Sequence, residues 1–358
     1  MEEKRKEQEK ETQREKKERK PRAKQEEQAK DEKSVQLEEQ RKKDKEEERL
    51  RRKKQAEDEE DQARLEAVVP SAPKPFKDTE YKKHYRTEAL PSKFRVYTVV
   101  RNFLVVFYTV FEGKSVEEAN ELADDFTDKL ANAEVKGLQK LDPSAKEGLL
   151  EKPGFALARS WSAVVKDAVC GREFCGLLNQ GIRSDNEYLI KDAVKLAATM
   201  NSYCVMERNP GAKGPPWPKE DKAENGQYAW QLWRGGRLPH DKLGWYQEHR
   251  DKDYRVNMFL STSTSKTVAE EFMRAHSYPK AAKCVLYHFY LDSNLRCLHV
   301  NCLESVTFVQ KEQEFLFPPY SAFRVLKIVE HPSFIEIDIK VHPDNRSVDE
   351  DVPTAPWA

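Results

Sequence analysis

The chain has 358 residues and a formal net charge of zero, because 63 basic residues balance 63 acidic residues. A chain of this length predicts about two domains, or one domain with appendages. The balanced charge gives no sustained positive field for a nucleic acid, so we expect no nucleic-acid partner.

A charged arm is predicted over residues 1–66, which carry 23 basic and 23 acidic residues. Several glutamates precede a basic residue by four positions, a spacing that favours helix. The leucines of this segment are too sparse and too irregular for the seam of a coiled coil. We therefore expect a solvated single helix or a disordered arm, followed by a proline-rich linker over residues 67–80.

Signals for export or membrane insertion are missing from the sequence. The opening residues, MEEKRKEQEK, lack the apolar core of a secretory signal. The longest apolar run, Phe103–Phe111, is far shorter than the roughly 20 residues of a membrane span, so it predicts a buried helix or strand. The six cysteines form no CxxC pair, which predicts reduced thiols and no metal site. We expect a cytoplasmic protein without a membrane span.

A helical layer is predicted over residues 81–205. Ser115 and Glu118 have the spacing of a capping box, and apolar residues follow them at helical intervals. The segments Phe155–Val169 and Leu189–Tyr203 repeat this amphipathic pattern.

Within residues 206–342, a loop rich in glycine, proline and lysine is predicted at Asn209–Gly226, and strands are predicted after it, because the apolar residues change there from a helical to an alternating period. A helix at Lys266–His276 interrupts them, and residues 343–358 are predicted to be a disordered tail. The fold class is therefore predicted to be α+β, with helices packed beside antiparallel sheets. The predicted strands are Tyr228–Trp233, Lys283–Asp292, Cys297–Val300, Glu314–Phe317, Phe323–Val329 and Phe334–Val341.

The first of three polar motifs is WQLWRGGRLP, at Trp230–Pro239, in which Arg234 precedes two glycines. Glycine lets the backbone approach a ligand closely, and arginine can bind a phosphate or carboxylate through two hydrogen bonds. Taken alone, the motif is more typical of a surface arginine before a turn.

The second motif is FLSTSTS, at Phe259–Ser265. In an extended chain Ser261, Ser263 and Ser265 lie on one face and present their hydroxyl groups together. Helix capping is the alternative, because a capping box begins at Thr267.

The third motif is KEQEFLFPPYSAFRV, at Lys311–Val325. If the chain is extended, Glu312 and Glu314 point the same way. Two like charges side by side cost free energy unless they are exposed or take part in chemistry. An exposed strand edge is the alternative for this motif alone.

Together, and in this order, the motifs resemble the mono-ADP-ribosyltransferases of the Arg–Ser–Glu class, the NAD–arginine ADP-ribosyltransferase family. The resemblance covers roughly residues 228–329, and EQEFLFPPYSAFRV is its strongest part. It implies split antiparallel sheets around a cleft for NAD, with a flanking helical layer. It also implies transfer of ADP-ribose from NAD to the guanidinium of an arginine-bearing protein or a small guanidine, with release of nicotinamide.

The resemblance assigns the chemistry to two glutamates and a serine. Glu314 corresponds to the catalytic glutamate, Glu312 to the upstream glutamate that marks arginine as the acceptor, and Ser261 to the serine that supports the cleft. Cleavage of the nicotinamide–ribose bond builds an oxocarbenium-like cation, which a carboxylate stabilises. A charged guanidinium is a poor nucleophile, so Glu312 is placed to deprotonate it.

The resemblance also implies five NAD-binding residues. Arg234 would hold the phosphates and ribose, and the backbone of Gly235 would meet the nicotinamide amide. Ser261 would order the nicotinamide-ribose side, together with Thr262 and Ser263. NAD is thus a substrate; whether NADP is also accepted is open, and no metal is implied.

Three other functions remain as alternatives. The same residues would serve an NAD glycohydrolase that delivers the sugar to water. A catalytically inactive binding scaffold is the second alternative, although the presence of Arg234, Ser261 and Glu314 favours activity. The third is a transferase that modifies tRNA or DNA, and the neutral charge argues against it.

Overall fold

The computed structural model describes residues 74–85, 95–138, 153–202, 230–275, 282–291, 300–303 and 307–355. All of the described residues belong to one compact unit within Asp61–Ala358. The predicted arm over residues 1–66 lies outside the described residues. The predicted boundary between the helical layer and the strands, near residue 205, also lies outside them.

The first part of the described chain is helical. The apolar run Phe103–Phe111 lies in a helix, and its side chains Phe103, Leu104, Phe107 and Tyr108 are buried. The capping box is confirmed: the Ser115 N–H donates to the Glu118 carboxylate at 3.1 Å, and the Glu118 N–H donates to Ser115 Oγ at 3.2 Å. Among the described residues, no helix combines the length and apolar character of a membrane span. The helices are α2 (Glu80–Tyr85), α3 (Val96–Phe111), α4 (Val116–Leu138), α6 (Pro153–Trp161), α7 (Phe174–Ser184) and α8 (Glu187–Asn201).

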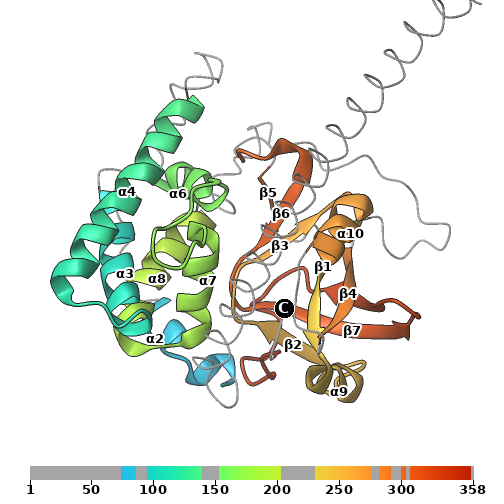
Figure 1. The fold of residues 1–358 in the computed structure, drawn as a ribbon. Helices are drawn as coiled ribbons and strands as arrows, with labels where there is room; N and C mark the ends of the chain where they lie inside the picture. The colour runs from blue at the N-terminus through green and yellow to red at the C-terminus, as the bar shows by residue number, and fades with distance from the viewer. Residues whose placement is uncertain are drawn as a thin grey trace, which may run out of the picture. The chain divides into compact units, whose positions relative to one another are not determined.

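The second part forms one sheet in the described chain, in the order β2-β7-β8-β4-β1-β3-β6-β5. Two further helices, α9 (His240–Glu248) and α10 (Lys266–Ala275), lie beside these strands (Figure 1). The sheet is nearly split, because β1 and β3 share a single register pair, Trp233 with Ser263. The strands are β1 (Trp230–Pro239), β2 (Asp253–Val256), β3 (Leu260–Ser263), β4 (Ala282–Leu291), β5 (Asn301–Cys302), β6 (Glu314–Phe317), β7 (Ser321–Glu330) and β8 (Ile335–Val341).

The predicted α+β class is confirmed, but one strand pairing is not antiparallel. Strands β4 and β8 run parallel, with His288 opposite Asp338. A parallel pair needs a crossover connection, and here β5, β6 and β7 intervene between the two strands. Strands β2, β3 and β5 and helix α9 are absent from the predicted list, and β1 continues to Pro239, beyond the predicted end at Trp233.

The helices pack directly on the strands that carry the polar motifs. The core of the helical part includes Phe259, Leu303, Leu316 and Tyr320, which belong to the strand-bearing part of the chain. A second core lies within the sheet. The side chains that enter the region around β3 and β6 therefore come from both parts.

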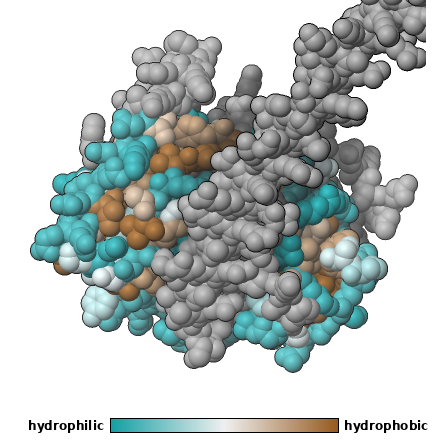
Figure 2. Space-filling view, viewed as in Figure 1, coloured by the Kyte–Doolittle hydropathy of each residue, from teal (hydrophilic) through white to brown (hydrophobic). Residues whose placement is uncertain are grey.

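Large apolar side chains remain exposed mainly in the helical part, where Val110, Val116, Val164 and Tyr188 are accessible. The space-filling view shows brown patches over these helices among teal neighbours (Figure 2). Single exposed apolar residues of this kind are common on protein surfaces, so we assign them no partner.

The prediction of a disordered tail from residue 343 is wrong for the described residues up to 355. Arg255 is buried, and its guanidinium donates to the carbonyls of Asn345 and Val348 at 3.0 and 2.8 Å. The Ala355 N–H donates to the Arg255 carbonyl at 2.8 Å. A buried arginine more than 80 positions upstream orders this polar segment, and no local pattern in the tail signals it.

Candidate functional site

The three polar motifs meet at adjacent strands. Arg234 lies on β1, Ser261 on β3 and Glu314 on β6. The Arg234 guanidinium donates through Nη1 to the Ser261 carbonyl at 2.8 Å, and the Ser261 side chain hydrogen-bonds the Glu314 carboxylate. Residues 234, 261 and 314 are thus one connected group, as the resemblance implied.

Glu314 is a buried carboxylate with identified donors. Only 5% of its surface is exposed, and burial raises its pKa. Hydrogen bonds from Ser261 and Trp161 and the positive charge of Arg234 oppose this rise in pKa. The Trp161 indole Nε1–H donates to Glu314 Oε1 at 3.1 Å. The two hydrogen bonds therefore hold the carboxylate in place and offset part of the cost that burial imposes on its charged form.

Glu312 is a second, half-buried carboxylate close to the first. Burial is the main cause that raises the pKa of Glu312 to about 6, and the negative charges of Glu314 and Glu173 add to it. A carboxylate with this pKa is suited to accept a proton near neutral pH.

The extended geometry predicted for the two glutamates is wrong. Glu312 ends a 3₁₀ turn, and Gln313 has a positive φ of 46°. Two hydrogen bonds of 2.7 Å hold this turn: Thr264 Oγ1 donates to Gln313 Oε1, and Ser263 Oγ donates to the Glu312 carbonyl. The carboxylates come together through this strained turn and not through strand alternation.

The remaining hydroxyl groups of the Ser-Thr run brace β3. Thr262 Oγ1 donates to the Phe315 carbonyl at 2.8 Å, and Ser263 Oγ donates to the Glu312 carbonyl. Ser265 Oγ accepts from the Val268 N–H at 3.4 Å, so the helix cap is Ser265, upstream of the capping box expected at Thr267. The contact of Thr262 and Ser263 with NAD stays a prediction.

Gly235 is explained by the packing of α10. A Cβ at this position would lie 1.8 Å from the Ala269 carbonyl oxygen and 2.6 Å from the Met273 nitrogen. Only glycine allows the helix to lie this close to β1. The contact between the Gly235 backbone and nicotinamide stays a prediction.

Two site residues from the helical part were missed by the sequence analysis. Trp161 ends α6, and Glu173 is the N-cap residue of α7, half-buried with its pKa raised chiefly by burial. Both lie in segments whose sequence shows only amphipathic helix and loop. Their proximity to Glu314 and Glu312 arises from the tertiary fold, and no motif marks it.

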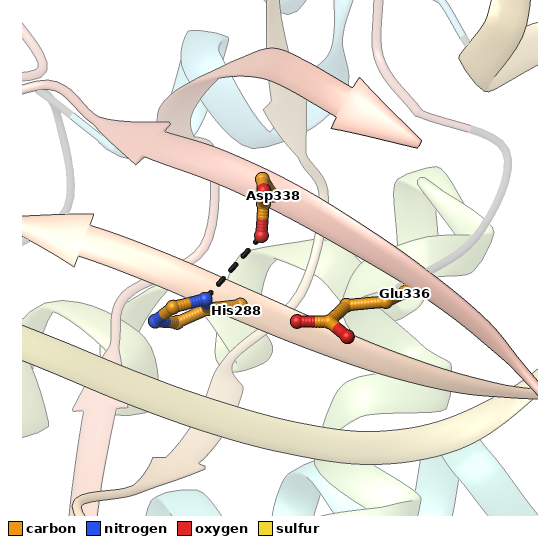
Figure 3. Close-up of side chains that lie close together, drawn as sticks. All are labelled: His288, Glu336 and Asp338. Carbon is orange, nitrogen blue, oxygen red and sulfur yellow. Dashed lines mark ion pairs between the residues drawn. The ribbon is translucent and has the colours of Figure 1, made fainter. Parts of the chain in front are cut away.

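His288, Glu336 and Asp338 form a separate cluster whose potential ligand atoms lie within 4.8 Å of one another (Figure 3). His288 Nδ1 lies 3.3 Å from Asp338 Oδ1, and its ring stacks on Trp233 at 3.6 Å. A metal-bound histidine normally donates its other ring N–H to a partner. His288 Nε2 is buried with no hydrogen-bond partner among the described residues, so we read the cluster as a histidine–aspartate pair. Trp233 and Arg234 are consecutive on β1, so their side chains point to opposite faces of the sheet. The cluster packs on Trp233 and therefore lies on the face opposite Arg234.

A scan against protein-family models and a search of curated proteins find no match for the chain. Among solved structures, the chain is similar to the Vis toxin, an ADP-ribosyltransferase from Vibrio splendidus. The two are 19% identical, with 64% of this chain and 87% of that one covered and a TM-score of 0.31.

It is also similar to the ADP-ribosyltransferase HopU1 of Pseudomonas syringae pv. Tomato DC3000, at 12% identity, 61% and 87% coverage and a TM-score of 0.39. A third similar structure is an ADP-ribosyltransferase from Clostridium botulinum, at 14% identity, 56% and 96% coverage and a TM-score of 0.34. All three are ADP-ribosyltransferases, the class that the motifs resemble. Because these identities and TM-scores are low, the function proposed below rests on the residues of this chain.

Proposed function

We propose that the chain is a mono-ADP-ribosyltransferase that transfers ADP-ribose from NAD to the guanidinium of an arginine, releasing nicotinamide. The supporting observation is the connected group of Arg234, Ser261 and Glu314, with Glu312 beside it. A buried carboxylate held by two donors, next to an arginine and a second carboxylate with a pKa of about 6, suits glycosyl transfer to a basic nucleophile.

The first step breaks the bond between nicotinamide and the ribose. Nicotinamide leaves with the bonding electron pair, and positive charge develops on the ribose carbon and ring oxygen. The carboxylate of Glu314, hydrogen-bonded to the ribose 2′-hydroxyl, stabilises that charge. The hydrogen bonds from Ser261 and Trp161 preorganise the carboxylate for this contact.

The second step forms the bond to the acceptor. A guanidinium nitrogen attacks the ribose carbon, and Glu312 accepts the proton that this nitrogen loses. The raised pKa of Glu312 brings its basicity closer to that of the group it deprotonates. The charge of the two carboxylates also attracts a cationic acceptor.

Arg234 binds the phosphates of NAD in this proposal. Its hydrogen bond to the Ser261 carbonyl fixes the orientation of the guanidinium plane, which a bidentate phosphate contact requires. Gly235, Thr262 and Ser263 shape the nicotinamide side. NADP is a candidate second substrate, since nothing in the proposed contacts depends on the adenosine 2′ position.

The acceptor separates this proposal from an NAD glycohydrolase. We would measure the transfer of labelled ADP-ribose from NAD to agmatine, a free guanidine, and nicotinamide release in parallel. The variants would be Glu312→Gln and, as a control, Glu330→Gln, an exposed glutamate paired with Lys283.

If agmatine is labelled by the wild type and by Glu330→Gln but not by Glu312→Gln, while Glu312→Gln still releases nicotinamide, the result supports a guanidine-directed transferase. Nicotinamide release without labelled agmatine in any variant supports a glycohydrolase. No NAD consumption by the folded wild type supports the binding scaffold.

A further inference from the structure

Trp161 links the helical part to the carboxylate that carries the proposed chemistry. Trp161 is the last residue of α6 and is 5% exposed. Its indole N–H lies 3.1 Å from Glu314 Oε1, and its ring packs on Phe259 at a centroid distance of 5.0 Å. The ring is therefore constrained on both sides, by packing and by a hydrogen bond across 153 positions of sequence.

The carboxylate needs this donor because it is buried. A buried charge without hydrogen bonds is costly, and a donor to the charged form stabilises it. Among the described side chains, Ser261 and Trp161 are the two that hydrogen-bond Glu314. Ser261 lies on the neighbouring strand and Trp161 on the helical part, so the carboxylate is held from two separate elements.

The same helix end also holds the segment that precedes Glu312. Ser162 directly follows Trp161 in the chain, and its Oγ accepts a hydrogen bond from the Phe308 N–H at 3.2 Å. The Arg159 guanidinium lies 3.6 Å from the centre of the Phe308 ring. One turn of α6 thus contacts both Glu314 and the approach to Glu312, which gives the helical part a role in the geometry of the site.

We propose that Trp161 is a positioning residue that acts through Glu314: its indole N–H holds the carboxylate in the ionised, oriented state that cleavage of NAD requires. This inference rests on the proposed function. Arg234 and Ser261 were expected from their motifs, whereas nothing in the sequence around Trp161 points to the site.

The test compares wild type, Trp161→Phe and, as a control, Trp245→Phe, a tryptophan of α9 whose indole stacks on His249, the C-cap residue of that helix. Phenylalanine keeps an aromatic ring against Phe259 but has no donor. Nicotinamide release is measured from pH 4 to 9 without an acceptor, so that Glu312 is not required. Removing a donor to the charged form raises the pKa of Glu314, so the acidic limb of the profile should move up by about one unit in Trp161→Phe only.

A lower rate at every pH with an unmoved acidic limb would mean that Trp161 is only a packing residue, and would overturn the inference. A second measurement does not need turnover: the ¹⁵N-indole resonance of Trp161, assigned by its loss in Trp161→Phe. It should titrate with pH in the wild type and stop titrating in Glu314→Gln. An indole resonance that does not respond to Glu314 contradicts the inference. No nicotinamide release by the wild type contradicts the proposed function alone, and the indole titration then still decides the role of Trp161.

Discussion

The side-chain amide of Asn179 in α7 forms two hydrogen bonds with the backbone of Phe259. Asn179 Nδ2 donates to the Phe259 carbonyl at 3.1 Å, and Asn179 Oδ1 accepts from the Phe259 N–H at 2.9 Å. Phe259 directly precedes β3, so the helical part satisfies the backbone at the point where the Ser-Thr-Ser strand begins.

Asn179→Ala should therefore destabilise the protein. The substitution leaves a part-buried N–H and carbonyl without partners, each at about 1–3 kcal/mol, so we expect a loss of roughly 2–4 kcal/mol. Gln247→Ala is the control, because that amide is exposed on α9. Urea unfolding measures the free energy of unfolding of both variants. Equally small decreases in the two would show that the Asn179 contact contributes little to stability.

Gly235→Ala should be far more disruptive than Gly236→Ala. At Gly235 the added carbon meets backbone atoms of α10, which cannot move aside, whereas at Gly236 the nearest atom belongs to the Tyr287 ring, 3.9 Å away. We expect a loss of about 3 kcal/mol for the first and less than about 1 kcal/mol for the second. Thermal unfolding of the two variants checks this, and similar melting temperatures would contradict the close packing of α10 on β1.

Much of the site could be predicted from sequence because its residues lie in short motifs. The boundaries of β6 and the capping box at Ser115 depend on local patterns and are confirmed, and the structure also brings together Arg234, Ser261 and Glu314, the residues that the family resemblance singles out. The first two features need only alternation and capping residues, whereas the grouping of the three site residues needs the resemblance to a known family.

The rest depends on contacts between distant segments. Trp161 reaches Glu314 only through tertiary packing, and Arg255 orders the tail by capping carbonyls that follow it by about 90 positions. The left-handed turn at Gln313 could not be predicted either, because glutamine has no preference for it; the Ser263 and Thr264 hydroxyls impose it.

Arg234→Lys should weaken the binding of NAD. Lysine carries the charge but lacks the planar fork that contacts the Ser261 carbonyl and, as we propose, a phosphate. Loss of a charge-assisted hydrogen bond predicts a KM for NAD about tenfold higher or more. Arg274→Lys, on the exposed side of α10, is the matched control. A KM that stays at the wild-type value in Arg234→Lys would remove Arg234 from the NAD site.

Glu312→Gln should stabilise the protein at neutral and alkaline pH. The pKa of Glu312 rises from 4.5 to about 6 in the folded state, so the folded protein binds this proton more tightly than the unfolded chain. The stability that the proton contributes is present below pH 4.5 and is lost as the pH rises through about 6. Because the side chain is half exposed, we expect the neutral variant to gain at most about 1 kcal/mol at pH 8 and almost nothing at pH 4. Unfolding at the two pH values tests this, and a gain that is equal at both would contradict the assigned burial and charge repulsion.

The most direct test of the proposed chemistry is nicotinamide release from NAD by the full chain and by Glu314→Gln. Glutamine keeps the shape of the side chain and can still accept from Trp161, but it lacks the charge that stabilises the ribose cation. We predict that the wild type releases nicotinamide and that the variant, with an unchanged fold by circular dichroism, is slower by about 10²-fold or more. Equal release by both proteins, or none from the wild type, would contradict the role of Glu314 in cleaving NAD.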